Sequence, residues 1–195
     1  FGVTPIVVDA KAALPITLQV DEPLSVGADR LINTLAASQL YQRDTICVDL
    51  GTATTFDCIT AEGVFLGGVI MPGVRTSAET LTRRTSKLPA IELLPPKQVI
   101  GTRTEECMRA GVLFGAADAI DGIVRRIKAE WPGREIPLVV ATGGLAETLQ
   151  PWCSEFDLIE PTLTLQGLRL AHGLLVQPYT DMRTAQLLPT RQTSP

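Results

Sequence analysis

The chain has 195 residues, of which 45% are hydrophobic and 19% are charged, a composition that favours a soluble globular protein over a disordered one. Its 17 basic and 21 acidic residues give a net charge of −4, which argues against a protein that coats nucleic acid through clustered Lys and Arg. No apolar run approaches the roughly 20 residues that a membrane span needs. The composition therefore predicts neither a nucleic-acid partner nor a membrane partner.

The four cysteines are widely spaced and form no Cys-x-x-Cys pair, so a Cys/His zinc site is not expected. Cys47 and Cys58 fall in apolar, strand-like runs, which is typical of buried free thiols. Together these features predict a reducing, cytoplasmic compartment. Because the chain begins at Phe1 and not at a methionine, the lack of a signal peptide carries little weight.

In the first part of the chain, the sequence predicts strands and one helix. Short β-branched runs predict strands over residues 4–8 and 16–20. A helix capped by Ser25 is expected to follow and to extend to about Tyr41. A mostly apolar strand over residues 45–50 then precedes a predicted hairpin of residues 54–60 and 64–71.

Helices and strands alternate in the second part. After a helix to about residue 85 and a proline-rich linker, apolar residues with a 3.6-residue period predict a long helix over residues 104–130. A buried strand over residues 137–141, a short helix, a strand near Leu158 and a helix over residues 164–176 complete the pattern. Residues 177–195 are rich in Thr, Gln and Pro and are predicted to form a mobile tail.

From Thr45 onward, the order of three strands, two helices, strand, helix, strand and helix predicts an α/β fold of the ribonuclease-H-like type. Such lobes occur in pairs in the actin-like ATPase superfamily. We therefore expect the remainder of a first lobe over residues 1–42, a complete second lobe over residues 43–176 and the tail over residues 177–195.

Two short segments contain acidic residues that could carry chemistry. Asp49-Leu50-Gly51-Thr52 follows a strand, and such a turn can direct backbone N–H groups to a phosphate while the carboxylate holds a cation. Gly27-Ala28-Asp29-Arg30 places a candidate general base beside an arginine that could bind an anionic substrate. Each has a simpler explanation, a capped hairpin turn for the first and an acidic first helical turn for the second.

Three pairs of glycines are also informative. Gly67-Gly68 permits a bulge or the close approach of a ligand or another chain, although a turn alone would explain it. Thr142-Gly143-Gly144 separates a strand from a helix, a position where nucleotides often bind. Gly111 and Gly115 on the long helix indicate either ordinary packing or a subunit interface.

In this order, the segments resemble the type III pantothenate kinase family of the actin-like ATPase superfamily. The resemblance spans about residues 21–175 and rests on Gly-Ala-Asp-Arg-Leu-Ile-Asn, Val-Asp-Leu-Gly-Thr-Ala-Thr-Thr-Phe-Asp, Leu-Gly-Gly-Val-Ile-Met-Pro-Gly, Ile-Gly-Thr-Arg-Thr, Ala-Thr-Gly-Gly-Leu and Leu-Thr-Leu-Gln-Gly-Leu. It implies ATP-dependent phosphorylation of pantothenate to 4′-phosphopantothenate, the first step of coenzyme A biosynthesis. It also implies Mg²⁺ with ATP, a monovalent cation (K⁺ or NH₄⁺), and a homodimer in which the partner helps to wall the pantothenate pocket.

The resemblance implies roles for individual residues. Asp29 would take the proton from the pantothenate hydroxyl, and Asp49 would bind the monovalent cation. The other residues expected to contact pantothenate are Gly27, Ala28, Arg30 and Thr104. The residues expected to contact ATP are Gly51, Thr52, Gly143 and Gly144.

The chain departs from the family pattern in two places. The family's first phosphate-binding turn, Asp-x-Gly-Asn-Thr, does not occur before Asp21, and Val20 stands where many relatives have a substrate-contacting tyrosine. The 195-residue chain is therefore expected to show little or no kinase activity by itself and to expose an apolar strand edge. Two alternatives stay open, a non-catalytic relative that assists transcription and another actin-like small-molecule kinase.

Overall fold

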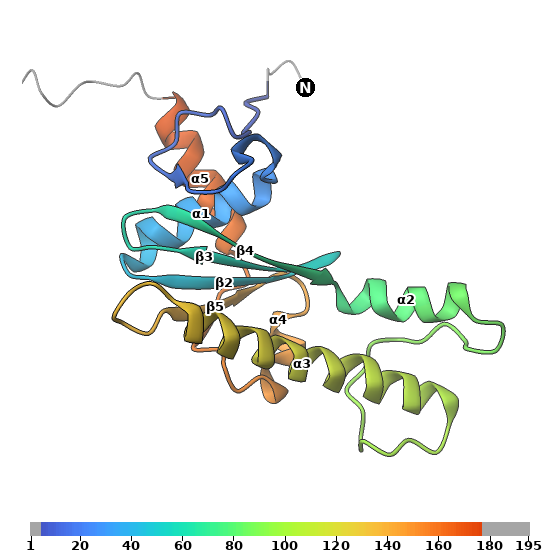
Figure 1. Cartoon of the computed structure of the whole chain (residues 1–195). Coiled ribbons are helices and arrows are strands. Elements are labelled where there is room, and N and C mark those ends of the chain that lie inside the picture. Colours follow the sequence, from blue (N-terminus) through green and yellow to red (C-terminus); the bar gives the residue numbers. More distant parts are fainter. Residues whose placement is uncertain (1–4, 177–195) are drawn as a thin grey trace, which may run out of the picture.

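A computed structural model describes residues 5–176 of the chain (Figure 1). Within this range the strands form one six-stranded sheet in the order β1-β4-β3-β2-β5-β6. β3 runs antiparallel to its neighbours β2 and β4, whereas β5 runs parallel to β2, β6 parallel to β5, and β1 parallel to β4. The strand bounds are β1 (Thr17–Leu18), β2 (Thr45–Leu50), β3 (Ala53–Ile59), β4 (Val64–Pro72), β5 (Leu138–Thr142) and β6 (Leu158–Ile159).

Helices cover both faces of the sheet (Figure 1). α1 (Ala28–Tyr41) and α5 (Leu163–Val176) pack together on one face, while α3 (Thr104–Glu130) and the short α4 (Ala146–Leu149) lie on the other. α2 (Val74–Arg84) runs beyond the edge of the sheet alongside the first half of α3, and we call these two segments the arm. Two 3₁₀ helices, η1 (Pro23–Ser25) and η2 (Gln150–Trp152), complete the elements of the described range.

The core follows the two-residue period of the strands. In β2, Ile46, Val48 and Leu50 join the cluster on the α3 side, and Cys47 joins the cluster beneath α1. The β5 strand follows the same alternation, with Val140 on the α1 side. Because both faces carry apolar side chains, the central strands are almost completely buried, as expected for a sheet between two helical layers.

The close packing of α1 and α5 depends on Gly167, where any side chain would collide with the backbone of Ile32. The two helices can therefore approach closely at this point. One turn before Gly167, the Thr164 hydroxyl donates a hydrogen bond of 2.8 Å to Oδ1 of Asn33. The packing thus brings α5 into contact with the buried Asn33 of α1.

The order of elements from β2 onward agrees with the sequence prediction, and the bounds of α3 agree as well. The prediction fails at the N-terminus, where residues 5–8 form no strand. Ile6 and Val7 are 50% and 75% exposed, and a short β-branched run becomes a strand only beside a partner. The predicted tail over residues 177–195 lies outside the described residues.

The expected cap of α1 is also wrong. Pro23 starts η1, and the Ser25 hydroxyl donates to the carbonyl of Glu22 within that turn. Gly27 occupies the N-cap position of α1 instead, with no side-chain capping bond. Among the helices of residues 5–176, none is long and apolar enough to cross a bilayer.

Candidate functional site

The carboxyl ends of the parallel strands β2 and β5 meet at one edge, where Asp49 pairs in register with Thr142. Each strand is followed by a small-residue turn, Gly51-Thr52 after β2 and Gly143-Gly144 after β5. A cavity of about 310 Å³ lies between these turns and the start of α2. Its lining residues are Leu50, Gly51, Thr52, Arg75, Thr76, Glu79, Gly144 and Leu145. The structure therefore brings together three of the predicted ATP-binding residues.

Hydrogen bonds hold the turn after β2 against α2. The carbonyl of Thr52 accepts from the backbone N–H of Gly73 at 3.1 Å and from the Thr76 hydroxyl at 2.6 Å. This places the N-terminus of α2, with its unpaired N–H groups and positive partial charge, beside the cavity. An anionic ligand such as a phosphate is favoured in this position.

Position 143 requires a glycine because of its backbone conformation and because of the atoms around it. Its φ of 89° lies in the left-handed region, and a Cβ would stand 2.7 Å from Oδ1 of Asp49 and from the backbone nitrogen of Leu50. A side chain at this position would be strained and would also clash. The absence of one lets the turn after β5 lie directly against the Asp49 carboxylate.

The Asp49 carboxylate is half-buried and fixed in orientation. Its Oδ2 accepts a hydrogen bond of 3.1 Å from Nδ2 of Asn33, and Oδ1 of Asn33 accepts in turn from Thr164. Burial raises the pKa of Asp49, the Asn33 hydrogen bond opposes this rise, and the charge of Asp29 adds to it. The sequence analysis missed Asn33 and Thr164, although Asn33 follows Asp29 by four residues and so shares its face of α1.

Asp29 and its neighbours form the first turn of α1. Asp29 is exposed, and its carboxylate folds back over Gly27, where a Cβ would lie 2.5 Å from Oδ1 of Asp29. Gly27 and Ala28 are exposed as well. Asp29 directly precedes Arg30, which bonds to Asp57, and lies four residues before Asn33, which bonds to Asp49. Its charge adds to the raised pKa of both carboxylates. The first turns of α1 thus connect the predicted base to both carboxylates of the sheet.

Arg30 points from α1 into the sheet. Its Nε donates a hydrogen bond of 2.6 Å to Oδ1 of Asp57 in β3, and its Cζ lies 4.9 Å from the ring centroid of Phe65 in β4. Burial raises the pKa of Asp57 to about 7, against the opposing charge and hydrogen bond of Arg30. Sequence analysis did not select Asp57, although a charged residue between Phe56 and Cys58 in an apolar strand was an available signal.

Thr104 stands apart from the other predicted substrate-binding residues. It begins α3 at the outer end of the arm, about 24 Å along the helix from the core residue Ile120 at 1.5 Å per residue. It lines a second, mostly apolar cavity of about 680 Å³. That cavity is also lined by Met71, Pro72, Ser77, Thr80, Leu81, Leu88, Cys107, Met108, Gly111, Val112, Gly115 and Ala116. No described residue of this lining belongs to the segment 27–30.

Comparison with known proteins identifies the family. The sequence model of the family "Type III pantothenate kinase" matches residues 1–126. A type III pantothenate kinase from Dehalococcoides mccartyi (strain CBDB1) is 44% identical over 174 residues, which cover 89% of this chain and 65% of that protein. One from Syntrophus aciditrophicus (strain SB) is 43% identical over 172 residues, covering 88% of this chain and 67% of that protein. The chain belongs to the type III pantothenate kinase family.

The chain spans about two thirds of the length of these type III pantothenate kinases. Among solved structures, a chain from Campylobacter jejuni described as a Baf family transcriptional activator superposes with a TM-score of 0.50 at 19% identity. The match covers 73% of this chain and 63% of that chain. At this level of identity the likeness concerns the fold alone, which is an α/β arrangement of a mixed sheet with helices on both faces.

Proposed function

We propose that the protein transfers the γ-phosphoryl group of ATP to the hydroxyl of pantothenate, the reaction for which its relatives are named. One observation carries this proposal: an exposed carboxylate, Asp29, lies one helical turn before Asn33, which bonds to Asp49 just ahead of the Gly51-Thr52 turn that lines the cavity. A phosphate-binding cavity beside a candidate base is what phosphoryl transfer to an alcohol requires. Family membership favours this function over a non-catalytic accessory factor and over a kinase with another substrate.

Asp29 would act as the general base. It accepts the proton of the hydroxyl while the hydroxyl oxygen forms a bond to the γ-phosphorus and the bond from that phosphorus to the β-γ bridging oxygen breaks, which releases ADP. Its exposed position in the first turn of α1 leaves the carboxylate accessible to a bound alcohol. Gly27 and Ala28 add little bulk beside it, and Arg30 would bind the anionic substrate through its guanidinium.

The ATP phosphates would lie in the 310 Å³ cavity, against the backbone of Gly51 and Thr52 and the N-terminus of α2. Gly143 and Gly144 would face the adenosine side. Mg²⁺ bound with ATP would neutralise charge on the transferred group, and a K⁺ or NH₄⁺ ion would do so from the protein side. Asp49 fits such an ion because Asn33 occupies one of its oxygens, while the other lies beside the Gly143 turn.

The proposal also covers how the chain is divided into lobes and where the protein is located in the cell. The order of elements and the mixed sheet support a ribonuclease-H-like lobe of the actin-like type over residues 43–176, with residues 1–42 as part of a first lobe. The four cysteines are free, which agrees with a reducing, cytoplasmic compartment.

A homodimer would unite the two parts of the pantothenate site. Within one chain, Thr104 lines a cavity that none of residues 27–30 lines. For Thr104 to contact pantothenate bound at residues 27–30, it would have to come from a second chain. A second copy whose arm packs against the first would supply Thr104 in trans. The apolar cavity of the arm, which Gly111 and Gly115 leave open, suits such a contact.

The test of this function is pantothenate-dependent ADP formation by the natural gene product that carries residues 1–195. Asp29→Asn removes the base but keeps the size of the side chain, and we expect kcat to fall by roughly 10²-fold or more. The matched control is Asp118→Asn, which neutralises an exposed Asp on α3 and should leave kcat unchanged. ADP formation that does not depend on pantothenate would contradict the proposed substrate, and near-normal turnover in Asp29→Asn would remove Asp29 from the mechanism.

A further inference from the structure

We propose that Asp57 is a positioning residue that holds the Arg30 guanidinium in the orientation in which it binds the substrate anion. This inference rests on the proposed function, since it assumes that Arg30 contacts pantothenate. It adds a residue that touches neither substrate nor ATP and acts only through Arg30.

The first support is the set of contacts around the Arg30 side chain. An arginine at the start of a helix has several rotatable bonds and would ordinarily move freely in solvent. Here the Nε bonds to Oδ1 of Asp57 at 2.6 Å, and the guanidinium lies over the Phe65 ring at 4.9 Å. The Asp57 side chain is fully buried, whereas the Arg30 side chain keeps 14% of its surface exposed. The sheet therefore fixes the guanidinium from beneath.

The second support is the space that Gly68 provides. Gly68 is the register partner of Asp57 on the neighbouring strand β4. A Cβ at Gly68 would stand 2.8 Å from Nη2 of Arg30 and would also collide with the carbonyl of Phe56. On β3, Asp57 thus supplies the hydrogen-bond acceptor for Arg30. On β4, the lack of a side chain at Gly68 leaves the space that the guanidinium occupies. At Gly68 the close neighbour is this arginine of the same chain, whereas the sequence analysis considered a ligand or another chain there.

The third support is that the ion pair is incompletely satisfied. Nη2 of Arg30 and Oδ2 of Asp57 are buried and have no hydrogen-bond partner within the described part of the chain. A buried ion pair of this kind contributes little to stability, and apolar residues of similar size are often at least as stabilising. An ion pair that served stability alone would be expected to have hydrogen-bond partners for all its buried polar atoms. A role in orienting Arg30 explains the unpartnered atoms better.

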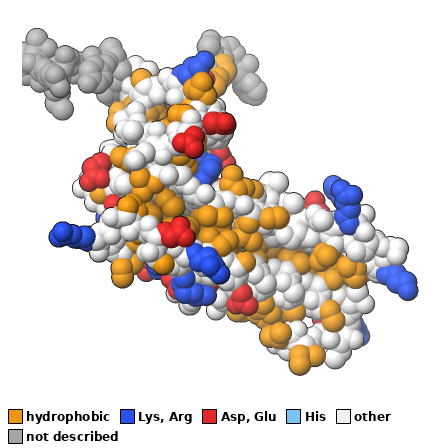
Figure 2. Space-filling view, in the orientation of Figure 1, with side chains coloured by type: hydrophobic (Ala, Val, Ile, Leu, Met, Phe, Trp, Pro, Cys, Tyr) orange, Lys and Arg blue, Asp and Glu red, His pale blue; other side chains and the backbone are white. Residues whose placement is uncertain are grey.

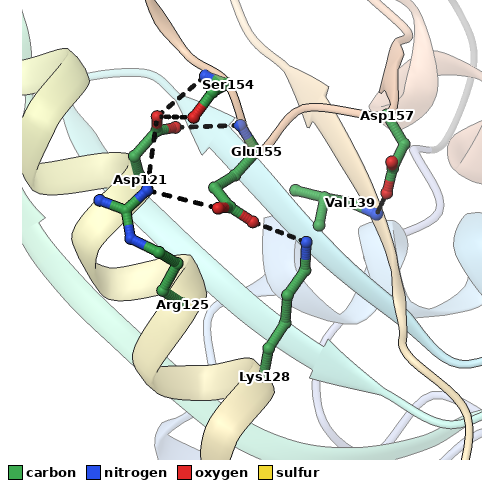
Figure 3. A network of polar contacts seen from close by, with 7 residues as sticks. All are labelled: Asp121, Arg125, Lys128, Val139, Ser154, Glu155 and Asp157. Carbon is green, nitrogen blue, oxygen red and sulfur yellow. Dashed lines mark hydrogen bonds and ion pairs between the residues drawn. The ribbon is translucent and has the colours of Figure 1, made fainter.

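The experiment compares Asp57→Val, Asp57→Asn and the control Asp121→Asn in the natural gene product. Val removes every acceptor, so we expect KM for pantothenate to rise about 10- to 100-fold with a smaller change in kcat, the range for losing a hydrogen bond to a charged group. Asn keeps one oxygen that can accept from Nε, so the rise should be several-fold smaller. Asp121 is also a buried carboxylate with several partners, but it lies beneath the sheet, and its substitution should lower Tm and leave KM unchanged (Figure 3).

A double variant covers the case in which Asp57→Val fails to fold. Arg30→Met with Asp57→Val replaces the pair by apolar side chains, and we expect a Tm no lower than that of the wild type. Its KM for pantothenate should equal that of Arg30→Met alone, because Asp57 acts only through Arg30. A double variant much less stable than the wild type, or a KM well above that of Arg30→Met, would overturn the inference.

The Arg30 Nε–H resonance separates this inference from the proposed function. In the free protein it should be protected from exchange, retained in Asp121→Asn and lost in Asp57→Val. Equal KM values in wild type and Asp57→Val, with turnover present, would overturn the positioning role alone. Absence of pantothenate turnover in the wild type would overturn the substrate, and the positioning role that rests on it, even with the protected resonance in place.

Discussion

Three carboxylates, Asp29, Asp49 and Asp57, lie around the start of α1, where Arg30 pairs with Asp57, and Arg75 of α2 lines the cavity in which the phosphates would bind. Only Arg30 makes an ion pair with any of them within residues 5–176. ATP would add further negative charge to a site that is already acidic. The proposed reaction therefore benefits from positive charge beyond that of Arg75, which lines the cavity with Glu79, and the partial charge of the α2 N-terminus.

The first prediction concerns the charge beside Asp49. Turnover should depend on a small monovalent cation, because such an ion at Asp49 would offset the repulsion between the carboxylates and the ATP phosphates. Asp49→Ala should abolish this dependence together with most of the activity. Initial rates in KCl and in tetramethylammonium chloride at equal ionic strength measure the effect. Equal rates in the two salts would contradict a cation site at Asp49.

The second prediction concerns the pH dependence of stability. Asp57 has a pKa of about 7 in the folded chain, against about 3.9 for an unperturbed Asp. The folded state therefore holds the proton more tightly, so the stabilisation from this group is complete below about pH 4 and is lost as the pH rises through 7. Burial is the main cause of this raised pKa; the charge and hydrogen bond of Arg30 oppose it, and the charges of Asp29 and Asp49 add to it.

Asp57→Asn removes this titration. Between pH 5 and pH 8 the unfolding free energy of the wild type should fall by about 2 kcal/mol more than that of Asp57→Asn. Urea unfolding at the two pH values provides the measurement. Parallel pH profiles for the two proteins would show that Asp57 is already ionised at pH 5 in the folded state.

At the scale of elements, a polar network joins α3 to the segment between η2 and β6 (Figure 3). Asp121 accepts hydrogen bonds from the backbone N–H groups of Ser154 and Glu155 at 2.9 and 3.2 Å and from the Ser154 hydroxyl. Glu155 bonds to Lys128 at 2.7 Å. Because the Asp121 side chain is only 9% exposed, its loss would leave backbone donors in this region without partners.

The third prediction follows from this burial. Asp121→Ala should lower the unfolding free energy by about 1–3 kcal/mol, the cost of leaving buried donors unsatisfied. Arg125→Ala serves as the comparison, because Arg125 belongs to the same network but its side chain is 56% exposed. Its loss should change the unfolding free energy by less than about 1 kcal/mol. Equal losses in both variants would mean that the exposed ion pairs, and not the buried carboxylate, join the elements.

The elements could be predicted from the sequence where local signals agreed. The long helix α3 combines a 3.6-residue apolar period with a Trp131-Pro132-Gly133 stop, and both bounds were predicted. The run over residues 5–8 is β-branched but lacks a neighbour to pair with, which a local pattern does not reveal. Strand formation there depends on tertiary contacts.

The candidate site could be predicted only in part, because some of its residues are brought together by tertiary contacts. Asp49 lies near the carboxyl end of β2, and Gly51, Thr52 and Gly144 lie on the turns after β2 and β5, so their meeting follows from the parallel pairing of these strands. Asp57 and Thr164 reach the site through helix-sheet and helix-helix packing that no spacing along the chain encodes. The proposed contact of Thr104 with pantothenate depends on a second chain, so neither the sequence nor the fold of a single chain predicts it.

At the scale of the whole molecule, the arm and the segment that connects its two helices leave apolar side chains exposed. Leu81 on α2 is 37% exposed, and Leu94 and Ile100 between the helices are 51% and 82% exposed. Figure 2 shows hydrophobic side chains gathered along this part of the molecule. Gly111 and Gly115 lie one turn apart on α3 and both line the apolar cavity. A second copy packed there would bury this surface and bring in its own Thr104.

The last prediction uses the two glycines to separate folding from association. A Cβ at Gly111 would meet no atom within 4 Å, so a side chain there causes no clash inside the chain. Because glycine is a poor helix former, Gly111→Ala should stabilise α3 by about 0.5–1 kcal/mol and alter association little. Gly111→Glu should also fold, but it places a charge in the apolar contact. We expect it to dissociate the dimer in sedimentation experiments and to raise KM for pantothenate, since Thr104 of the partner would be lost from the site. A Gly111→Glu protein that stays dimeric with an unchanged KM would show that the arm is not the interface.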